Sequence, residues 1–212
     1  MDQPSVKGRR TQLIIAGIVG LIVLVAALDE FVKPRVFPKK FGVVIEDSLY
    51  RSGRIHEALL PKILKDYQID TIVTMTHAID TIEWQQEERR IAKELDVDLI
   101  RFPLRGDGTG DITSYVEALR AIQRELGNDR RVLVHCAAGT ERTGGVVFLY
   151  RTLFLDQPQD EAYAEMLEYG FNPKRNTALL PYLMDGVPIV VAGLGQYGLA
   201  TKSAPDMSLL GH

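Results

Sequence analysis

The chain has very little cysteine and no excess of positive charge. Its 212 residues include one cysteine, Cys136, so no disulfide can form within the chain and no second thiol can protect the first from oxidation. Lysine and arginine number 25 against 28 acidic residues, a net charge of −3. A nucleic-acid-binding protein usually has a basic surplus, so we expect no DNA or RNA partner. The apolar fraction, 46%, is sufficient for one well-packed domain.

The single cysteine lies in the segment VLVHCAAGTERTG, residues 132–144, where an apolar strand pattern leads through a short loop into a helical pattern. The first N–H groups of a helix have no partner within the helix and carry partial positive charge. A loop that enters a helix therefore binds phosphate and favours thiolate over thiol. The position of Cys136 predicts a phosphate-binding loop built around a nucleophilic sulfur.

Arg142 and Thr143 follow the cysteine at offsets that suit this chemistry. The planar guanidinium of Arg142 can hold two phosphate oxygens at once, which the point charge of a lysine cannot do. The Thr143 hydroxyl is within reach of the sulfur. The alternative is a buried structural cysteine with an arginine nearby by coincidence, and the joint occurrence of these residue types makes that interpretation much the weaker one.

These residues resemble the signature of the cysteine-dependent protein tyrosine and dual-specificity phosphatases, which is His-Cys, five residues, then Arg followed by Ser or Thr. The matching positions are His135, Cys136, Gly139, Arg142 and Thr143. The resemblance covers about residues 41–186 and implies an α/β fold like that of the dual-specificity phosphatases, with a central, largely parallel sheet flanked by helices. It also implies a cysteinyl-phosphate intermediate formed on Cys136, with no metal and no other cofactor.

The same resemblance implies roles for the other residues of the loop. Thr143 would help the thiolate leave, and His135 would brace the loop without touching substrate. The phosphate-binding residues would be Ala137, Ala138, Gly139, Thr140, Glu141 and Arg142. The variable loop positions hold no lysine or arginine, whereas phosphoinositide and inositol-polyphosphate members usually place basic residues there. Glu141 would repel additional phosphates, so a singly phosphorylated side chain is the expected substrate.

Two aspartates compete for the role of general acid. Residues 99–111 form a strand pattern that ends in a glycine-rich loop, about thirty residues before the cysteine, where the dual-specificity group carries its acid. Asp107 is favoured, because the glycines on both sides leave a loop that can move over a bound phosphate. Asp111 opens a helical pattern and is better interpreted as its N-cap. Asp111 as the acid remains the open alternative.

An uninterrupted apolar run, residues 13–28, follows a short basic tail, residues 1–12. Its length lies between that of a signal-peptide core and that of a bilayer span, so a cleaved leader and a retained anchor both fit. We expect a retained, single transmembrane helix in contact with the lipid bilayer, because no helix breaker precedes Asp29. The basic tail favours a catalytic domain outside the cytoplasm, but basic residues after the run weaken this preference, and the side stays open.

The remainder of the chain divides by composition. Residues 29–40 are rich in proline and basic residues and are expected to be a linker. Residues 41–186 alternate strand and helix patterns, as a single α/β catalytic domain would. Residues 187–212 are expected to be a glycine-rich, flexible tail, with packing on the domain surface as the alternative. Ligands of such sheets bind beyond the carboxyl ends of the strands, where the loops of Cys136 and Asp107 both fall.

The sequence therefore predicts a membrane-anchored phosphomonoester hydrolase of the tyrosine or dual-specificity type. Its expected partner is a phosphorylated protein side chain, phosphotyrosine first, with phosphoserine and phosphothreonine admitted by a shallow pocket. The alternatives are a catalytically inactive phosphate-binding module, a phosphoinositide phosphatase and a sulfurtransferase. The Asp107 loop argues against an inactive module, and Arg142 followed by Thr143 argues against sulfur transfer.

Overall fold

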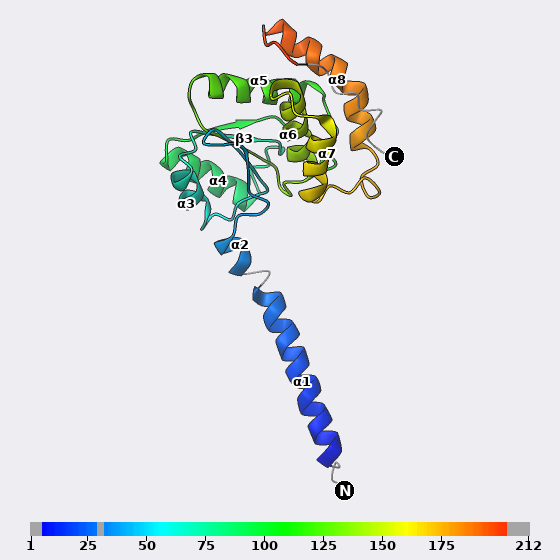
Figure 1. Cartoon of the computed structure of the whole chain (residues 1–212). Coiled ribbons are helices and arrows are strands. Elements are labelled where there is room, and N and C mark those ends of the chain that lie inside the picture. The colour runs from blue at the N-terminus through cyan, green and yellow to red at the C-terminus, as the bar shows by residue number, and fades with distance from the viewer. Residues whose placement is uncertain (1–5, 29–31, 203–212) are drawn as a thin grey trace. The chain divides into compact units, whose positions relative to one another are not determined.

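The computed structural model describes residues 6–28 and 32–202, with side chains from residue 15 onward except residue 27. The chain divides into two units, Met1–Phe37 and Pro38–His212. The first unit contains α1 (Val6–Ala27) and a single turn, α2 (Lys33–Val36) (Figure 1). The predicted linker thus includes a helical turn. Its first turn contains Pro34, whose fixed φ suits the start of a helix. Residues 29–31 lie outside the described residues.

The second unit contains one five-stranded sheet with the strand order β1-β2-β5-β3-β4. The first two strands pair antiparallel, and the other pairs are parallel. The strands are β1 (Gly42–Ile45), β2 (Leu49–Ser52), β3 (Thr71–Thr74), β4 (Asp98–Arg101) and β5 (Val132–His135). The predicted α/β fold with a central, largely parallel sheet is confirmed.

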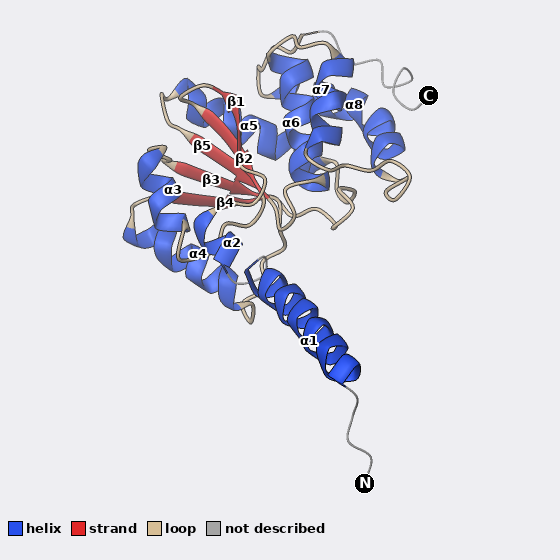
Figure 2. Cartoon of the chain, turned by 60° about the horizontal axis from the view of Figure 1, so that its bottom comes forward, coloured by secondary structure: helices blue, strands red, loops and turns tan. Residues whose placement is uncertain are grey.

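Helices cover both faces of the sheet, as Figure 2 shows. On one face lie α3 (Leu60–Asp66) and α4 (Glu83–Glu94); on the other lie α5 (Thr113–Gly127), α6 (Glu141–Phe154), α7 (Gln159–Glu168) and α8 (Leu179–Gln196). Side chains alternate along a strand, so Leu133 packs against the first layer while Val132 and Val134 pack against the second. All residues of β2, β3 and β5 are buried, which explains the nearly continuous apolar run of β5.

Three strands end at the same level on one edge of the sheet. In the parallel register, Ser52 of β2 and Thr74 of β3 are both partners of His135 at the end of β5. The residues that follow these three strands therefore emerge together. This register brings Cys136 next to Gly53 and Met75, which are distant from it in the sequence.

The C-terminal segment differs from the prediction of a flexible tail. The helix α8 continues through Pro188 to Gln196, and its Val187, Val190 and Leu194 are buried. Glycine allows α8 to approach α5 closely, since a Cβ atom at Gly193 would lie 3.0 Å from Val116. In residues 187–196, the glycines that suggested a flexible tail thus allow a helix to pack closely. Residues 203–212 lie outside the described residues.

The apolar helices differ in burial. Among the described residues, α8 is the one helix long and apolar enough to cross a membrane, and 39% of it is buried within the protein. The described apolar stretch of α1, Ile15–Ala26, is exposed and shorter than the ~20 residues of a bilayer span. The side chains at the outer ends of the predicted span, residues 13–14 and 27, lie outside the description.

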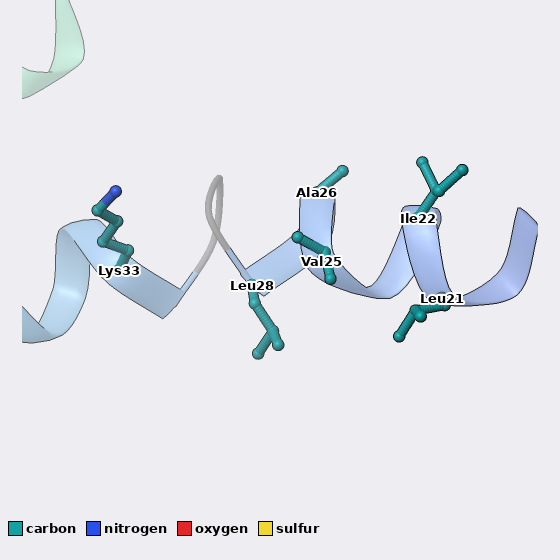
Figure 3. A pocket seen from close by; sticks show the side chains of 6 residues that line it. All are labelled: Leu21, Ile22, Val25, Ala26, Leu28 and Lys33. Carbon is teal, nitrogen blue, oxygen red and sulfur yellow. The ribbon is translucent and has the colours of Figure 1, made fainter. Parts of the chain in front are cut away.

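An apolar groove of about 710 Å³ occupies the first unit (Figure 3). The side chains that line it are Leu21, Ile22, Val25, Ala26, Leu28 and Lys33. Lys33 is the only charged residue among them. The described part of α1 therefore presents an apolar surface that no other part of its own unit covers.

Two neighbouring glycines of α6 are expected to respond oppositely to substitution by alanine. A Cβ atom at Gly145 would lie 2.5 Å from the Tyr115 hydroxyl and 3.1 Å from its ring, whereas at Gly144 the nearest atom, from Met166, would be 3.6 Å away. We expect Gly145→Ala to destabilise the fold by about 1–3 kcal/mol through overpacking. Gly144→Ala should stabilise it by up to about 1 kcal/mol through helix propensity.

Urea denaturation of both variants beside the wild type measures these two effects. Equal shifts of the midpoint in the same direction would contradict the close packing of α5 against α6. The Gly144→Ala variant serves as the control for adding a methyl group to this turn of the helix.

Candidate active site

Cys136 lies in the loop between the end of β5 and the start of α6. Its thiol is buried, with 1% exposure, and its Sγ accepts a hydrogen bond of 3.2 Å from the Gly139 N–H. Gly139 has φ of +77°, and a Cβ atom there would lie 2.5 Å from the Gly53 nitrogen. Only glycine combines this backbone conformation with this close approach. The loop therefore curls around the sulfur and packs directly on the end of β2.

The carbonyl groups of the loop are held by donors that lie outside it. These contacts are His135 Nδ1 to the Cys136 carbonyl at 3.3 Å, the Arg54 N–H to the Ala137 carbonyl at 3.1 Å, and Arg51 Nη2 to the Gly139 carbonyl at 3.2 Å. The carbonyl and N–H of one peptide unit point in opposite directions. Fixing the carbonyls outward therefore directs the following N–H groups toward the middle of the loop.

These inward N–H groups have no protein partner. Within residues 6–28 and 32–202, no acceptor binds the N–H groups of Ala137, Ala138, Thr140, Glu141 or Arg142. Buried or half-buried N–H groups are rarely left unpaired in a folded protein. Their clustering beside the start of α6, where the helix dipole adds positive potential, makes the loop an anion-binding site.

The environment of the thiol favours its ionised form. Burial acts to raise the pKa of Cys136, but hydrogen bonds from the Thr143 hydroxyl and N–H, the charge of Arg142 and the Gly139 N–H together lower the pKa below its usual value. Thr143 is fully buried at the first turn of α6, and its hydroxyl also lies 3.4 Å from the Ser52 carbonyl. A lowered pKa increases the thiolate fraction, which is the nucleophilic form of the sulfur.

Arg142 stands beside the loop at the end of β3. Its Nη1 donates a hydrogen bond of 3.4 Å to the Met75 carbonyl, and its buried Nε has no hydrogen-bond partner among the described residues. Part of the guanidinium is therefore available to an anion in the loop. The positive charge of Arg142 acts on the Cys136 thiol and lowers its pKa.

Arg51 also supports the Cys136 loop. Its guanidinium is fully buried, pairs with Glu165 at 2.9 Å and lies 3.6 Å from the centre of the Tyr169 ring, in addition to its bond to the Gly139 carbonyl. A charge this deeply buried is stable only when paired. Arg51 thus holds the loop in shape.

Lys40 contacts the loop from the other side. It lies in the segment expected to be a linker, but its ammonium donates hydrogen bonds to the Thr140 hydroxyl and, at 2.7 Å, to the Tyr169 carbonyl. Burial lowers the pKa of Lys40, and the charge of Glu141 opposes this effect. No local sequence pattern indicates these contacts, because Lys40 is far from both partners in the chain.

A second ionic cluster lies behind the loop. His135 Nε2 is 3.1 Å from Oε1 of Glu88, and both side chains are buried. The other carboxylate oxygen of Glu88 is 3.6 Å from Arg101, whose Nη1 donates at 3.1 Å to the Thr76 carbonyl. The sequence predicted that His135 braces the loop, but its pattern did not distinguish Glu88 from the other acidic residues of α4.

The two candidate acids have different environments. The Asp107 carboxylate accepts hydrogen bonds from the N–H of Thr109 at 2.9 Å and its hydroxyl at 2.8 Å, and these bonds lower the pKa of Asp107. The Asp111 carboxylate accepts a bond of 2.9 Å from the N–H of Thr113, the first residue of α5. Asp111 therefore caps the helix, although it lies one residue before the N-cap position.

The Asp107 loop is tied to the domain at two consecutive carbonyl groups. Asn176 donates a hydrogen bond of 2.7 Å to the Asp107 carbonyl, and the buried Tyr115 hydroxyl donates one of 2.7 Å to the Gly108 carbonyl. No local sequence pattern indicates either contact. In this structure the loop is held by side chains from α5 and from the turn before α8, rather than left free by its glycines.

A cavity of about 370 Å³ lies between the Asp107 loop, the start of α6 and the turn before α8. Its lining residues are Gly106, Asp107, Glu141, Arg175, Asn176, Thr177 and Ala178. Glu141 thus faces this cavity, and Arg175 adds a cation whose guanidinium has no partner among the described side chains. In the described part of the chain, no group of three or more His, Cys, Asp or Glu side chains is arranged to hold a metal ion.

Comparison with known proteins agrees with this geometry. A family model described as "Polymorphic toxin system, DSP-PTPase phosphatase" matches residues 49–153, which include β2, β5 and the Cys136 loop. Residues 49–153 of the chain therefore belong to the cysteine-based phosphatases of the tyrosine and dual-specificity family. The remaining comparisons concern its fold and its curated relatives.

Two solved structures illustrate the shared fold. TpbA of P. aeruginosa is 21% identical with a TM-score of 0.56, and the match covers 73% of this chain and 88% of TpbA. The catalytic core of Siw14 from S. cerevisiae is 16% identical with a TM-score of 0.59, and the match covers 79% of this chain and 99% of that one. At these identities the likeness shows a common fold for the phosphatase.

Curated relatives match over a shorter part of their own length. Two CTP synthases, from Koribacter versatilis and Acidobacterium capsulatum, are 28% and 33% identical over 134 and 131 residues. These matches cover 58% and 60% of this phosphatase but only 21% and 22% of the two relatives. The chain thus spans about a fifth of the proteins it matches, and their synthase activity is not carried over to it.

Proposed function

We propose that this phosphatase hydrolyses phosphomonoesters of protein side chains, phosphotyrosine first, through a cysteinyl-phosphate intermediate on Cys136. The observation that carries the proposal is the set of five unpartnered N–H groups around a buried thiol of lowered pKa. A structural cysteine has no need of such a loop, whereas the three equatorial oxygens of a phosphoryl group would pair with these donors.

In the first step, the Cys136 thiolate attacks phosphorus and the bond from phosphorus to the ester oxygen breaks. The loop N–H groups and the free part of the Arg142 guanidinium hold the equatorial oxygens, whose charge rises in the transition state. Asp107, in its protonated form, gives its proton to the departing oxygen, so the alcohol or phenol leaves neutral. The products of this step are the free hydroxyl compound and a phosphorylated Cys136.

In the second step, water attacks the phosphorus and displaces the sulfur. The Asp107 carboxylate formed in the first step accepts a proton from this water. The Thr143 hydroxyl, which already bonds to the sulfur, stabilises the thiolate as it leaves. Inorganic phosphate departs, and both Cys136 and Asp107 return to their starting states.

The choice of phosphotyrosine is supported by the loop and by one structural neighbour. TpbA has been crystallised in complex with phosphotyrosine, whereas Siw14 is described as a PP-IP phosphatase. In this chain the loop contributes a carboxylate, Glu141, to the adjoining cavity, and Arg175 is the cation opposite in charge. A cavity of mixed charge suits a peptide better than a polyphosphate ligand.

We further propose that residues 13–28 anchor the protein in a membrane as a single span. The helix α1 has 22 residues, a length of about 33 Å at 1.5 Å per residue. Its described apolar side chains are about half exposed or more, for example Leu21 at 61% and Ile22 at 62%. Exposure of this apolar surface to water costs free energy, and the hydrocarbon core of a bilayer would remove that cost by covering it. Residues 29–40 would then tether the catalytic domain near the bilayer.

The first prediction tests the nucleophile. The full-length protein is expected to hydrolyse an aryl phosphate in the presence of a chelator, and Cys136→Ser should reduce turnover by about 10⁴-fold or more. Release of inorganic phosphate measures the rate. A folded wild-type protein that binds phosphate without turnover would instead support the inactive phosphate-binding module.

The second prediction separates the two aspartates on a phosphotyrosine peptide. Asp107 must be protonated to act as the acid, so the rate should fall as pH rises through its pKa, which the Thr109 bonds hold low. Asp107→Asn should lower kcat by about 10²–10⁴-fold and remove this descending limb. Asp111→Asn should change kcat by less than about twofold. The reverse pattern would assign the acid to Asp111.

The third prediction tests the anchor in the full-length chain. Ile18→Lys combined with Ile22→Lys should move the protein from the membrane fraction to the soluble fraction, since each charge at a helix centre costs about 2.5–3.5 kcal/mol on insertion. Turnover of the aryl phosphate should persist. The matched control, alanine at both positions, should remain in membranes after alkaline extraction. Retention of the lysine variant there would refute the span.

A further inference from the structure

Glu88 is a carboxylate on the buried face of α4, a helix rich in charged residues. It is 6% exposed, and α4 also carries Glu83, Glu87, Arg90 and Glu94. One carboxylate oxygen lies 3.1 Å from His135 Nε2, and the other lies 3.6 Å from Arg101 Nη2. A carboxylate is almost never buried unless it is paired, so His135 and Arg101 account for the burial of Glu88.

Both ring nitrogens of His135 face groups that can only accept hydrogen bonds. Nε2 faces the Glu88 carboxylate, and Nδ1 lies 3.3 Å from the carbonyl oxygen of Cys136. A neutral imidazole carries one N–H donor, so it can satisfy one of these acceptors at most. Only the doubly protonated ring presents a proton to both. The contact of Nε2 with Glu88 is an ion-pair contact without hydrogen-bond geometry, and it favours an imidazolium cation at His135 when Glu88 is ionised.

His135 lies against the Cys136 carbonyl, and the direction of this carbonyl affects the anion site. That carbonyl is one of those held outward so that the following N–H group can face the anion site. The imidazolium directly supports the peptide unit of the nucleophile and places a positive charge behind the sulfur. Removing the proton from Nδ1 would leave two acceptors facing each other and would release this end of the loop.

We propose that Glu88 is a positioning residue that keeps His135 doubly protonated and thereby holds Cys136 as a thiolate and the loop in its anion-binding shape. This inference rests on the proposed function, in which Cys136 is the nucleophile. Glu88 does not touch the substrate; it acts through His135.

The charges around His135 support this role from each neighbouring element. Glu88 and Arg89 come from α4, Arg101 from β4, and Cys136 from the loop itself, while Thr74 at the end of β3 and Thr76 after it are neutral. Burial acts to lower the pKa of His135, but Glu88 and the Cys136 sulfur raise it above its usual value. Burial acts to raise the pKa of Glu88, but His135, Arg101 and Arg89 lower it.

The cluster carries a net positive charge behind the loop. Glu88 contributes one negative charge, and His135 and Arg101 contribute one positive charge each, so a single positive charge remains for the thiolate and the bound phosphate. Arg101 also donates hydrogen bonds to the carbonyl and hydroxyl oxygens of Thr76. Thr76 follows Met75, and the Met75 carbonyl accepts a hydrogen bond from Arg142. The cluster is therefore linked to Cys136 through His135, and to Arg142 through Thr76 and Met75.

The experiment is the pH dependence of Cys136 alkylation by iodoacetamide in the full-length protein. Cys136 is the only cysteine, so the rate reports a single thiolate. Glu88→Gln keeps the size of the side chain but removes the charge. We expect it to raise the pKa of Cys136 and to move the ascending limb of the kcat/KM profile to higher pH by the same amount.

The control is Glu87→Gln, which removes the same charge from the neighbouring position. Glu87 pairs with Arg90 on the exposed side of α4, so neither the thiol pKa nor the kcat/KM profile should change. A purely structural role for Glu88 would lower the unfolding midpoint and leave the thiol pKa unchanged. A thiol pKa that stays constant or falls in Glu88→Gln therefore overturns the proposal.

A double variant tests the route through His135. In a His135→Asn background, Glu88→Gln should shift the thiol pKa no further, and a second shift of the same size would show that Glu88 acts by another path. If Glu88→Gln does not fold, nuclear magnetic resonance of the wild-type His135 ring decides the question. Two protonated nitrogens at pH 7 support the proposal, and a neutral ring overturns it.

These outcomes separate the inference from the proposed function. Alkylation requires no turnover, so an inactive wild-type protein would refute the hydrolytic function while the effect of Glu88 on the thiol is still measured. Conversely, normal turnover with an unshifted thiol in Glu88→Gln would refute only the role of Glu88.

Discussion

The structure depends on one arrangement around Cys136. A ring of backbone N–H groups without protein partners lies beside the buried sulfur. Unpaired N–H groups cost free energy, and so does a buried negative charge. The Gly139 N–H pairs with the sulfur, and a phosphoryl group bound in the loop would pair with the other N–H groups. The loop cannot supply this geometry alone. Gly139 provides the required turn, and the carbonyl groups must be held from outside so that the N–H groups stay directed inward.

The donors that hold the carbonyl groups come from several elements, and two of them are themselves buried cations. Arg51 is balanced by Glu165, and His135 is balanced by Glu88. Buried ion pairs contribute little net stability, because desolvation offsets much of their attraction. Their value here lies in position: a charged donor fixes a carbonyl in a direction that an apolar side chain could not define. The core around the loop is therefore built for geometry at some expense of stability.

The other half of the site depends on the helical layer of the second face. Tyr115 of α5 and Asn176 before α8 hold consecutive carbonyl groups of the Asp107 loop, and both α5 and α8 pack closely where glycines permit it. The C-terminal helix thus belongs to the functional part of the domain. Its buried face explains why a segment long and apolar enough to span a bilayer is instead packed within the protein.

Much of the fold and the centre of the site follow from local sequence. The strand, loop and helix that carry Cys136, Arg142 and Thr143 are adjacent in the chain, so their spacing predicts how they meet. The order of strands and helices in residues 41–186 was also predictable, because periodicity is a local property. The family resemblance likewise rests on one short segment. Asp107 was favoured over Asp111 for the same reason, since a cap is recognised from the residues that follow it.

Only the tertiary structure decided which distant residues support the loop. The contact of Arg51 with Glu165 joins residues 114 positions apart, that of Lys40 with the Tyr169 carbonyl spans 129, and that of Asn176 with the Asp107 carbonyl spans 69. Glu88 was one of several acids in a charged helix, and no local pattern marked it as buried. The sequence by itself determined the chemistry of the nucleophile, because that chemistry is local. Packing across the sheet decided how the nucleophile is held, because it depends on which side chains the fold brings together.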